Sequence, residues 1–366
     1  MNIEVSCNKL SHALNTVSRV AVGKVTLPIL NNVLIRVDDK KVSLITTNLD
    51  MAVVDYLPVS SSENGVITVP AKLLTEFVSN LPKSETVKIS ASDTKVQINA
   101  GKYSSTINGA PADDFPELPE LDEEKAVTFK LGIDDFKVSV GQVIIASSND
   151  LTRPALTGVY FNTLDGTLAI AATDGYRLAE KKLIEKVESE VKAIVPTITL
   201  QEVLRSITDD VEEIEISFND DLVRFRLGEV EIISKLIDAS FPDYQKLIPK
   251  NNNIHLELDR EELIRTTKLA ALFARSVGGS IICEAATPDT FSIKSVANEF
   301  GENDSRIETT VETPGRINLN SRFLLDALNA ITDSTVEFHF SDHVAPALLK
   351  NKNNDKYTHI IMPLNS

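Results

Sequence analysis

The chain of 366 residues repeats one pattern three times, and this repetition limits its possible folds more than any other feature. A short alternating strand followed by an amphipathic helix begins at Ile3, at Val127 and at Ile254, so the starts lie 124 and 127 residues apart. Self-similarity at a fixed period indicates repeated structural units. We therefore expect three domains of similar fold. Their predicted boundaries are 1–122, 123–250 and 251–366.

Each repeat reads as strand, helix, several strands, helix and several strands. Runs such as KVSLITT from Lys41 and GVYFNTL from Gly158 combine alternation with β-branched and aromatic residues, which is typical of strands. The pattern predicts an α+β class, with two helices per domain packed on antiparallel sheets. The predicted helices span 8–19, 70–81, 133–147, 196–208, 259–276 and 320–331.

Composition excludes a membrane protein. The longest stretch without Asp, Glu, Lys or Arg has 12 residues, 138–149. A spanning helix needs about 20. The N-terminal sequence carries Glu4 and no apolar segment of the signal-peptide type. We expect a cytoplasmic protein with no membrane partner.

The sequence predicts neither a metal site nor a catalytic site. Cys7 and Cys283 lack CxxC spacing, so both are expected to be reduced core thiols. The five histidines form no HxxxH or HExxH pair, which argues against zinc. Asp174 lies beside a glycine, but no second acid, base or metal ligand accompanies it, so we expect it to stabilise a turn. We expect no cofactor and no enzymatic activity.

Five motifs lie in order on this repeated chain: TLPIL at 26–30, ATDGYRLA at 172–179, SKLIDASFPDY at 234–244, FLLDALNAI at 323–331 and MPL at 362–364. With these motifs the chain resembles the bacterial sliding clamp family, the beta subunit of DNA polymerase III. The resemblance covers all three repeats.

The resemblance implies a head-to-tail homodimer that forms a closed ring of six similar domains around double-stranded DNA, without sequence preference. Twelve helices would line the pore, and the ring would tether a polymerase to its template. Other implied partners are the DNA polymerase III catalytic subunit, the clamp loader complex, and other polymerases and repair proteins that carry clamp-binding peptides. A repeat-built interaction scaffold that never encircles DNA is the alternative.

The net charge of −16 argues against nucleic acid until the helices are counted separately. The predicted helices contain ten bases and eight acids, so they carry +2 while the remainder carries −18. A weakly basic bore suits a ring that slides, because many phosphate contacts would hold it in place. The alternative for each basic residue is that it lies on a solvated helix face and does not contact DNA. The predicted DNA-binding residues are Lys24, Lys72, Asn149, Arg153 and Arg205.

The family also has a groove for partner peptides, and its residues carry over where the motifs match. We expect an apolar cleft rimmed by Arg177 and Lys246; the alternative is that these residues only fill a seam between domains. Gly278, where the family often has a larger side chain, and the Asn365-Ser366 ending depart from the pattern. The predicted groove residues are Leu156, Thr173, Gly175, Tyr176, Arg177, Leu178, Pro242, Lys246, Leu247, Asn320, Phe323, Val344, Pro346, Ile360, Met362, Pro363 and Leu364.

The segment KYSSTIN, residues 102–108, is the expected joint strand of the dimer. By the family pattern, Ile107 meets Leu272 and Phe273 of the partner. The alternative is that these three apolar residues belong to domain cores.

Overall fold

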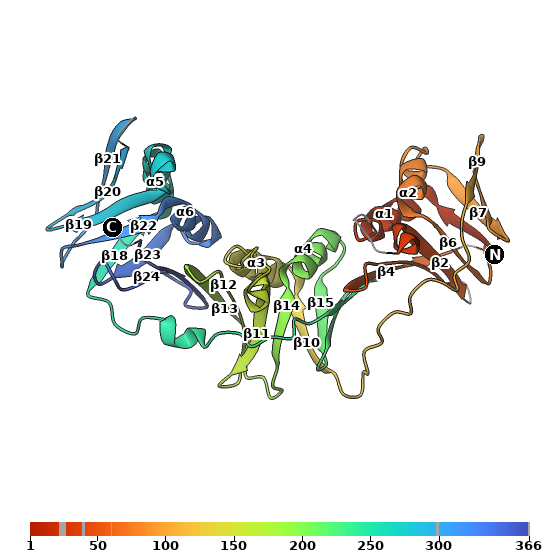
Figure 1. Cartoon of the computed structure of the whole chain (residues 1–366), viewed down its shortest axis with the longest axis horizontal. Helices are drawn as coiled ribbons and strands as arrows, with labels where there is room; N and C mark the ends of the chain where they lie inside the picture. The colour runs from red at the N-terminus through yellow and green to blue at the C-terminus, as the bar shows by residue number, and fades with distance from the viewer. Residues whose placement is uncertain (22–26, 39–40, 60, 298–299, 365–366) are drawn as a thin grey trace. The chain divides into compact units, whose positions relative to one another are not determined.

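The computed structural model describes residues 1–21, 27–38, 41–59, 61–297 and 300–364 (Figure 1). The chain forms two compact units. Unit 1 contains residues 1–134 and 198–236, and unit 2 contains residues 135–197 and 237–366. The middle repeat is therefore divided between the units, and the predicted domain boundaries remain predictions.

All six predicted helices are present in the described residues, each within a few residues of its predicted ends. The α-helices are α1 (Cys7–Val17), α2 (Ala71–Ser79), α3 (Ile133–Ile144), α4 (Thr197–Ser206), α5 (Arg260–Ala274) and α6 (Ser321–Ala330). Short 3₁₀ turns are η1 (Pro28–Asn31), η2 (Pro154–Thr157), η3 (Tyr244–Leu247) and η4 (Arg275–Val277). Asp259 caps α5 by accepting a hydrogen bond from the backbone N–H of Glu262, which satisfies a donor left free at the helix start.

Unit 1 holds two antiparallel sheets. The first has the order β5-β1-β7-β8-β9, and the second has the order β10-β15-β16-β17-β4-β3-β2-β6. The strands of the first sheet are β1 (Asn2–Ser6), β5 (Ser61–Glu63), β7 (Thr86–Ser92), β8 (Lys95–Ala100) and β9 (Tyr103–Asn108). Those of the second are β2 (Asn32–Asp38), β3 (Lys41–Thr47), β4 (Met51–Pro58), β6 (Gly65–Pro70), β10 (Val127–Gly132), β15 (Glu213–Phe218), β16 (Leu222–Leu227) and β17 (Val230–Lys235).

Unit 2 also holds two antiparallel sheets, in the orders β14-β11-β12-β13-β25-β24-β23-β18 and β21-β20-β19-β22. The strands of the larger sheet are β11 (Gly158–Leu164), β12 (Thr167–Thr173), β13 (Arg177–Glu185), β14 (Lys192–Pro196), β18 (Ile254–Asp259), β23 (Thr335–Phe340), β24 (Ala347–Asn351) and β25 (Tyr357–Ile361). Those of the smaller are β19 (Ser280–Ala286), β20 (Thr290–Ala297), β21 (Gly301–Glu308) and β22 (Gly315–Asn320).

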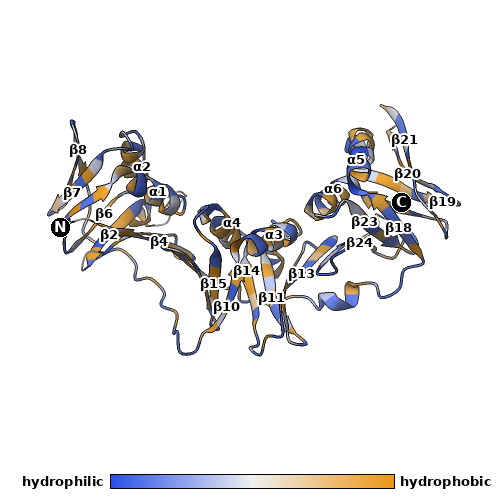
Figure 2. Ribbon diagram, turned by 180° about the vertical axis from the view of Figure 1, so that it is seen from behind, coloured by the Kyte–Doolittle hydropathy of each residue, from blue (hydrophilic) through white to orange (hydrophobic). Residues whose placement is uncertain are grey.

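The alternation of apolar and polar residues along each strand decides which face of the sheet packs against the helices. In β18, Ile254, Leu256 and Leu258 are buried while the residues between them are exposed. In α1, the buried Leu10, Leu14 and neighbouring apolar residues share one face. Figure 2 shows that the helices and strands carry both hydrophobic and hydrophilic residues. In unit 1, α1 packs on β3 and β4, and in unit 2, α5 packs on β18. Burial of the apolar faces of these helices and sheets forms the core of each unit.

Each eight-stranded sheet is made from halves of two repeats joined by main-chain pairing. In unit 1, β17 pairs with β4, and Ile233 lies opposite Ala52. In unit 2, β25 pairs with β13, and Ile360 lies opposite Leu178. The two ladders are equivalent under the repeat. The backbone N–H of Tyr56 donates to Glu229 at 3.0 Å in unit 1. In unit 2, the N–H of Lys182 donates to Lys356 at 2.9 Å.

The third ladder of this kind is missing from the described part of the chain. Strand β21 corresponds to β4 and β13, and β9 corresponds to β17 and β25. Both β21 and β9 are edge strands, one in each unit. Edge strands leave a row of N–H and C=O groups able to pair with another chain. The predicted joint segment, 102–108, is therefore a sheet edge.

The two ladders hold ionisable side chains of opposite type, an acid in one and a base in the other. Asp55 in β4 is 4 % exposed, and its burial, followed by the nearby Glu229, raises its pKa to about 7. The corresponding residue of β13 is Lys181, which is 8 % exposed. Burial, followed by repulsion from Lys356, lowers the pKa of Lys181. Within the described residues, Asp55 forms no ion pair, so its ionised form is poorly compensated.

Replacement of Asp55 by Asn is expected to stabilise unit 1 at alkaline pH. Below the usual pKa of 3.8 the carboxyl is neutral in both folded and unfolded chains. Between that value and about 7 only the folded chain holds the proton, so the free energy of unfolding falls as pH rises through this window. Above it, the ionised carboxylate costs about 2–4 kcal/mol.

Thermal unfolding of the wild-type chain and Asp55→Asn at pH 5 and pH 8 checks this expectation. The advantage of the variant should be larger at pH 8. Asp220→Asn, at an exposed turn, serves as the matched control. An advantage independent of pH would show that ionisation of Asp55 is not its cause.

Candidate functional site

The predicted groove residues of unit 2 gather where β13 pairs with β25. Leu178 and Ile360 lie opposite each other in this ladder, and each is 2 % exposed. They pack in one buried cluster with Ala171, Tyr244 and Leu348. This cluster forms an apolar floor, and Leu156 and Thr173 are buried as well.

A tight turn between β12 and β13 positions the residues above this floor. The carboxylate of Asp174 accepts hydrogen bonds from the backbone N–H groups of Tyr176 at 2.9 Å and Arg177 at 3.0 Å. The N–H of Gly175 donates to the Thr173 hydroxyl at 3.0 Å. Gly175 has φ +92°, a conformation that L side chains rarely adopt. The prediction that Asp174 stabilises a turn is confirmed, and the turn presents Tyr176 with 60 % exposure.

Arg177 is buried beneath this turn, which corrects the prediction that it forms an exposed rim. Its side chain is 8 % exposed. Its Nε donates to Asp174 at 3.1 Å, its Nη1 donates to Asp326 at 2.5 Å, and the guanidinium lies 4.5 Å from the ring centre of Phe323. Two carboxylates and an aromatic face compensate the burial of the guanidinium. Arg177 thus joins the β12–β13 turn to α6.

The exposed predicted groove residues come from three segments. Tyr176 is joined by Leu247 at 46 % exposure and Val344 at 62 %, with Gly175, Pro242 and Lys246 also exposed. A hydrogen bond from Lys246 to Asp243, at 2.7 Å, raises the pKa of the Lys246 ammonium. The half-buried members are Asn320, Phe323, Pro346, Met362, Pro363 and Leu364.

Main-chain hydrogen bonds hold the C-terminal segment beside these residues. The N–H of Met362 donates to Tyr176 at 2.8 Å, and the N–H of Leu364 donates to Asn318 at 2.9 Å. Gly278 has φ +69°, and no heavy atom lies within 4 Å of the position that a Cβ would take there. The side of the site near Gly278 is therefore open.

The predicted DNA-binding residues are placed separately in each unit. In unit 1, the side chain of Lys72 on α2 is 79 % exposed, and that of Arg205 on α4 is 62 % exposed. In unit 2, Asn149 is exposed, and Arg153 is 47 % exposed and pairs with Asp150 at 3.1 Å. Lys24 lies outside the described residues.

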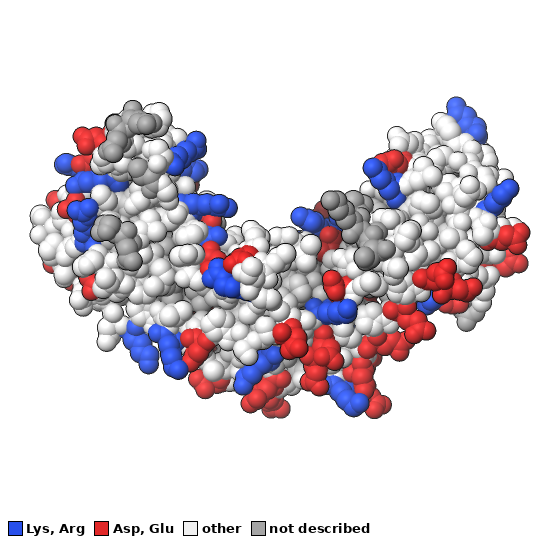
Figure 3. Space-filling model, viewed as in Figure 1, with Lys and Arg blue, Asp and Glu red and all other residues white. Residues whose placement is uncertain are grey.

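Acidic side chains of unit 1 gather away from these helices. Figure 3 shows red carboxylates where Figure 1 places the segment that follows β9. These acids are Asp113, Asp114, Glu117, Glu120, Asp122, Glu123 and Glu124. The acidic surplus of the chain therefore includes a segment separate from α2 and α4.

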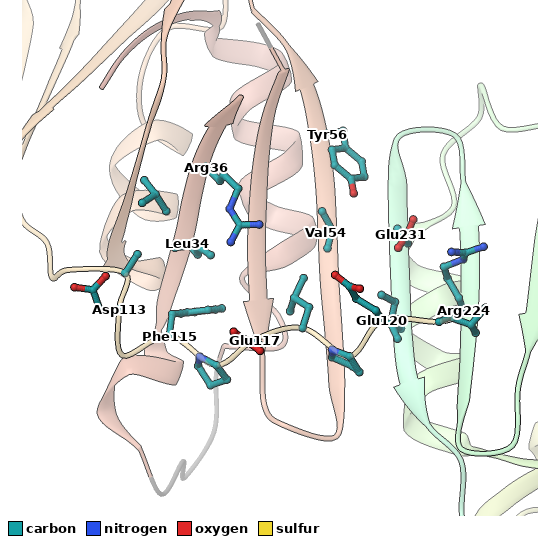
Figure 4. Close-up of a pocket in the computed structure, with 17 residues that line it drawn as sticks. Leu34, Arg36, Val54, Tyr56, Asp113, Phe115, Glu117, Glu120, Arg224 and Glu231 are labelled. Atoms are coloured by element: carbon teal, nitrogen blue, oxygen red, sulfur yellow. The ribbon is translucent and has the colours of Figure 1, made fainter. Parts of the chain in front are cut away.

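The same acidic segment borders a cavity of about 1000 Å³ that is also lined by residues of β2, β4, β6, β16 and β17 (Figure 4). Phe115 packs with Leu34, Ile45 and Val54. Arg224, 7 % exposed, donates to Glu123 at 2.9 Å and so fixes the end of the segment.

The predicted dimer residues divide into one buried and two accessible positions. Ile107 is 5 % exposed and lies opposite Val96 within its own sheet, so within the chain it is a core residue, as the alternative reading allowed. Leu272 on α5 is 57 % exposed, and Phe273 is half-buried. Sequence reasoning missed the exposed Val296 and Phe300, because an apolar residue at a strand end reads as core from its spacing.

The described residues hold no group of three or more His, Cys, Asp or Glu side chains placed to bind a metal ion. Both cysteines are free and buried. Burial raises the pKa of Cys283 to about 12 and also raises that of Cys7. Neither thiol is therefore activated as a nucleophile at neutral pH.

Comparison with known proteins shows which protein family this chain belongs to. Three family models match in order along the chain: the DNA polymerase III beta subunit N-terminal domain at 1–119, its central domain at 130–243 and its C-terminal domain at 245–365. A beta sliding clamp of Staphylococcus aureus is 30 % identical over 363 residues, covering 96 % of both chains. The chain belongs to the bacterial beta sliding clamp family.

Solved structures agree with this assignment. A DNA polymerase sliding clamp of Pseudomonas aeruginosa matches with a TM-score of 0.94 and 27 % identity over 100 % of both chains. A sliding clamp of Bartonella birtlesii, solved bound to griselimycin, matches with a TM-score of 0.93 and 29 % identity, again over the full length of both. The chain is accordingly a DNA sliding clamp, a processivity factor, and the scaffold alternative is not favoured. No described helix has the length and apolar character needed to cross a membrane.

Replacement of Arg177 by Lys is expected to destabilise unit 2 although the charge is kept. An ammonium group cannot reproduce the two directed hydrogen bonds and the stacking on Phe323, so the carboxylates of Asp174 and Asp326 lose a partner. We expect a loss of about 1–3 kcal/mol. Urea unfolding checks this, with the exposed Lys246→Ala as a control expected to change little. Equal stability of Arg177→Lys and the wild type would contradict the role given to Arg177.

Proposed function

We propose that two copies of this chain close head to tail into a ring around double-stranded DNA. The observation that carries the proposal is the missing third ladder: β4–β17 and β13–β25 pair within the chain, whereas β21 and β9 remain edges. If β21 of one copy pairs with β9 of the next, every repeat is joined in the same way. A head-to-tail contact that closes on itself leaves neither edge exposed.

The internal ladders also suggest the register of the joint between copies. In β4–β17, Asp55 lies opposite Val230. The hydrogen bonds from Thr46 to Val17 and from Ser295 to Ala270 align β3 with β20, which places Ser305 at the position of Asp55. The equivalent of Val230 is Tyr103, the residue after the β8–β9 turn.

Transfer of this register places Tyr103 of one copy opposite Ser305 of the other. Tyr103 is 40 % exposed, so it is free to join such a contact. Near β21, Leu272, Val296 and Phe300 are each more than half exposed. An apolar patch beside an unpaired strand supports burial against another protein surface.

The proposed ring holds DNA by enclosure and contacts it weakly. Lys72 and Arg205 extend from helices into solvent, as a screened phosphate contact requires. Lys24, Asn149 and Arg153 are further proposed contacts, carried over from the family. The ring itself is proposed to be non-catalytic and to work in the cytoplasm, as expected of a bacterial replication protein.

Leu272→Lys is expected to open the ring. A charge at this apolar position costs free energy when the joint buries it, while the folded chain already exposes the residue. Light scattering should give a mass near twice 40.1 kDa for the wild type and near 40.1 kDa for the variant. Ile198→Lys, at a helix position with 63 % exposure, is the matched control and should remain a dimer.

The same variants test enclosure of DNA. After loading, the wild type and Ile198→Lys should stay on nicked circular plasmid and leave the linearised form, whereas Leu272→Lys should be retained on neither. Equal retention of the wild type on circular and linear DNA would contradict a ring.

We further propose that the site above the Leu178–Ile360 floor binds short peptides of the DNA polymerase III catalytic subunit, the clamp loader, and other polymerases and repair proteins. Exposed Tyr176, Leu247 and Val344 around a buried apolar floor support an apolar peptide ligand. Met362 is half-buried at the edge of this site, and its flexible side chain can adapt to different guests.

Removal of residues 362–366 is expected to abolish peptide binding. The truncation begins after Ile361, so β25 and its pairing with β13 stay intact. Calorimetry with a synthetic peptide from the polymerase catalytic subunit measures the effect. Leu151→Ala, at an exposed residue outside the site, is the control. Unchanged affinity of the truncated chain would exclude this segment from the site.

A further inference from the structure

Two histidines that are far apart in the sequence meet in unit 2. His255 of β18 and His339 of β23 lie directly opposite each other in the antiparallel pair. Their Nδ1 atoms are 2.5 Å apart, and the two rings are nearly perpendicular, with centres 4.7 Å apart. The spacing rule that predicted no zinc site considers one helix or loop at a time, so it does not detect a pair formed across strands.

A carboxylate orients one of these rings. Oε2 of Glu337 lies 3.4 Å from Nε2 of His339, and the two residues are two apart on one strand, so they share a face. A proton on Nε2 directed at this carboxylate leaves the lone pair of Nδ1 facing His255. Histidines that bind metals commonly donate their second ring N–H to a carboxylate in this way.

The strands beneath the pair are held by the core, while the pair itself can be reached from solvent. Leu256 and Phe338, on the opposite face, are 2 % and 0 % exposed. His255 is exposed, and the side chain of His339 is 16 % exposed.

Two further charged side chains, Glu257 and Lys350, flank the pair. Glu257 lies beside His255 on the same face but pairs with Lys352 at 2.6 Å. Lys350 of β24 lies opposite Glu337. The site therefore offers two imidazole ligands and one orienting carboxylate.

We propose that His255 and His339 form a surface site for a divalent transition-metal ion of the kind that favours imidazole, with zinc as the probe. Zinc binds imidazole nitrogen at about 2.0–2.1 Å in tetrahedral geometry. A small rotation of the exposed His255 ring separates the two Nδ1 atoms enough to admit the ion. Among the described residues no group of three metal-binding side chains gathers here, so water would complete the coordination of the ion.

Calorimetric titration of the full chain with zinc chloride alone tests the site. The wild type should bind one ion per chain, and His255→Gln and His339→Gln should each lose this binding. Glu337→Gln, which leaves both ligands in place, should weaken binding about 10–100-fold. His12→Gln replaces an exposed histidine of unit 1 and should bind like the wild type.

A second readout reports the binding atoms. Nitrogen NMR of the imidazole rings should show zinc-dependent shifts at Nδ1 of both histidines in the wild type. The thermal midpoint should rise with zinc in the wild type and not in His255→Gln. Absence of zinc uptake by the wild type, or equal uptake by a His255→Gln, His339→Gln double variant, would overturn the proposal.

Discussion

Main-chain pairing between strands of successive repeats is the interaction on which the rest of this structure depends. The β4–β17 and β13–β25 ladders turn separate half-sheets into continuous eight-stranded sheets. Each ladder also orders the chain around it. The hydrogen bond from Met362 to Tyr176 extends the second ladder beyond β25 and brings the C-terminal segment to the β12–β13 turn. The proposed peptide site therefore depends on the pairing of β13 with β25 within the chain.

Much of the fold could be predicted because its signals are local or periodic. The three repeats, the six helices and edge segment 102–108 follow from alternation, helical spacing and the recurrence of landmarks. The turn at Asp174 was also predictable, since Asp beside Gly is a local signal for a turn.

The sequence could not show how charges and apolar groups are paired over long distances. Arg177 reads as a rim residue because arginine is usually exposed, but Asp326, 149 positions away, allows it to be buried. Ile107 faces its own sheet, while Leu272 faces solvent, although both are apolar residues at regular spacing. The His255–His339 pair depends on strand register, which no spacing rule along one segment contains.

The acid at one internal ladder and the base at the other have a consequence for how the sequence of such a chain can change. A ladder is held by backbone groups that every residue except proline provides, so its strength depends little on the side chains beside it. The same register position can therefore hold Asp55 in one repeat and Lys181 in another while the strands still pair. Repeats joined in this way can differ in the charge of the residues at each ladder while the fold stays the same.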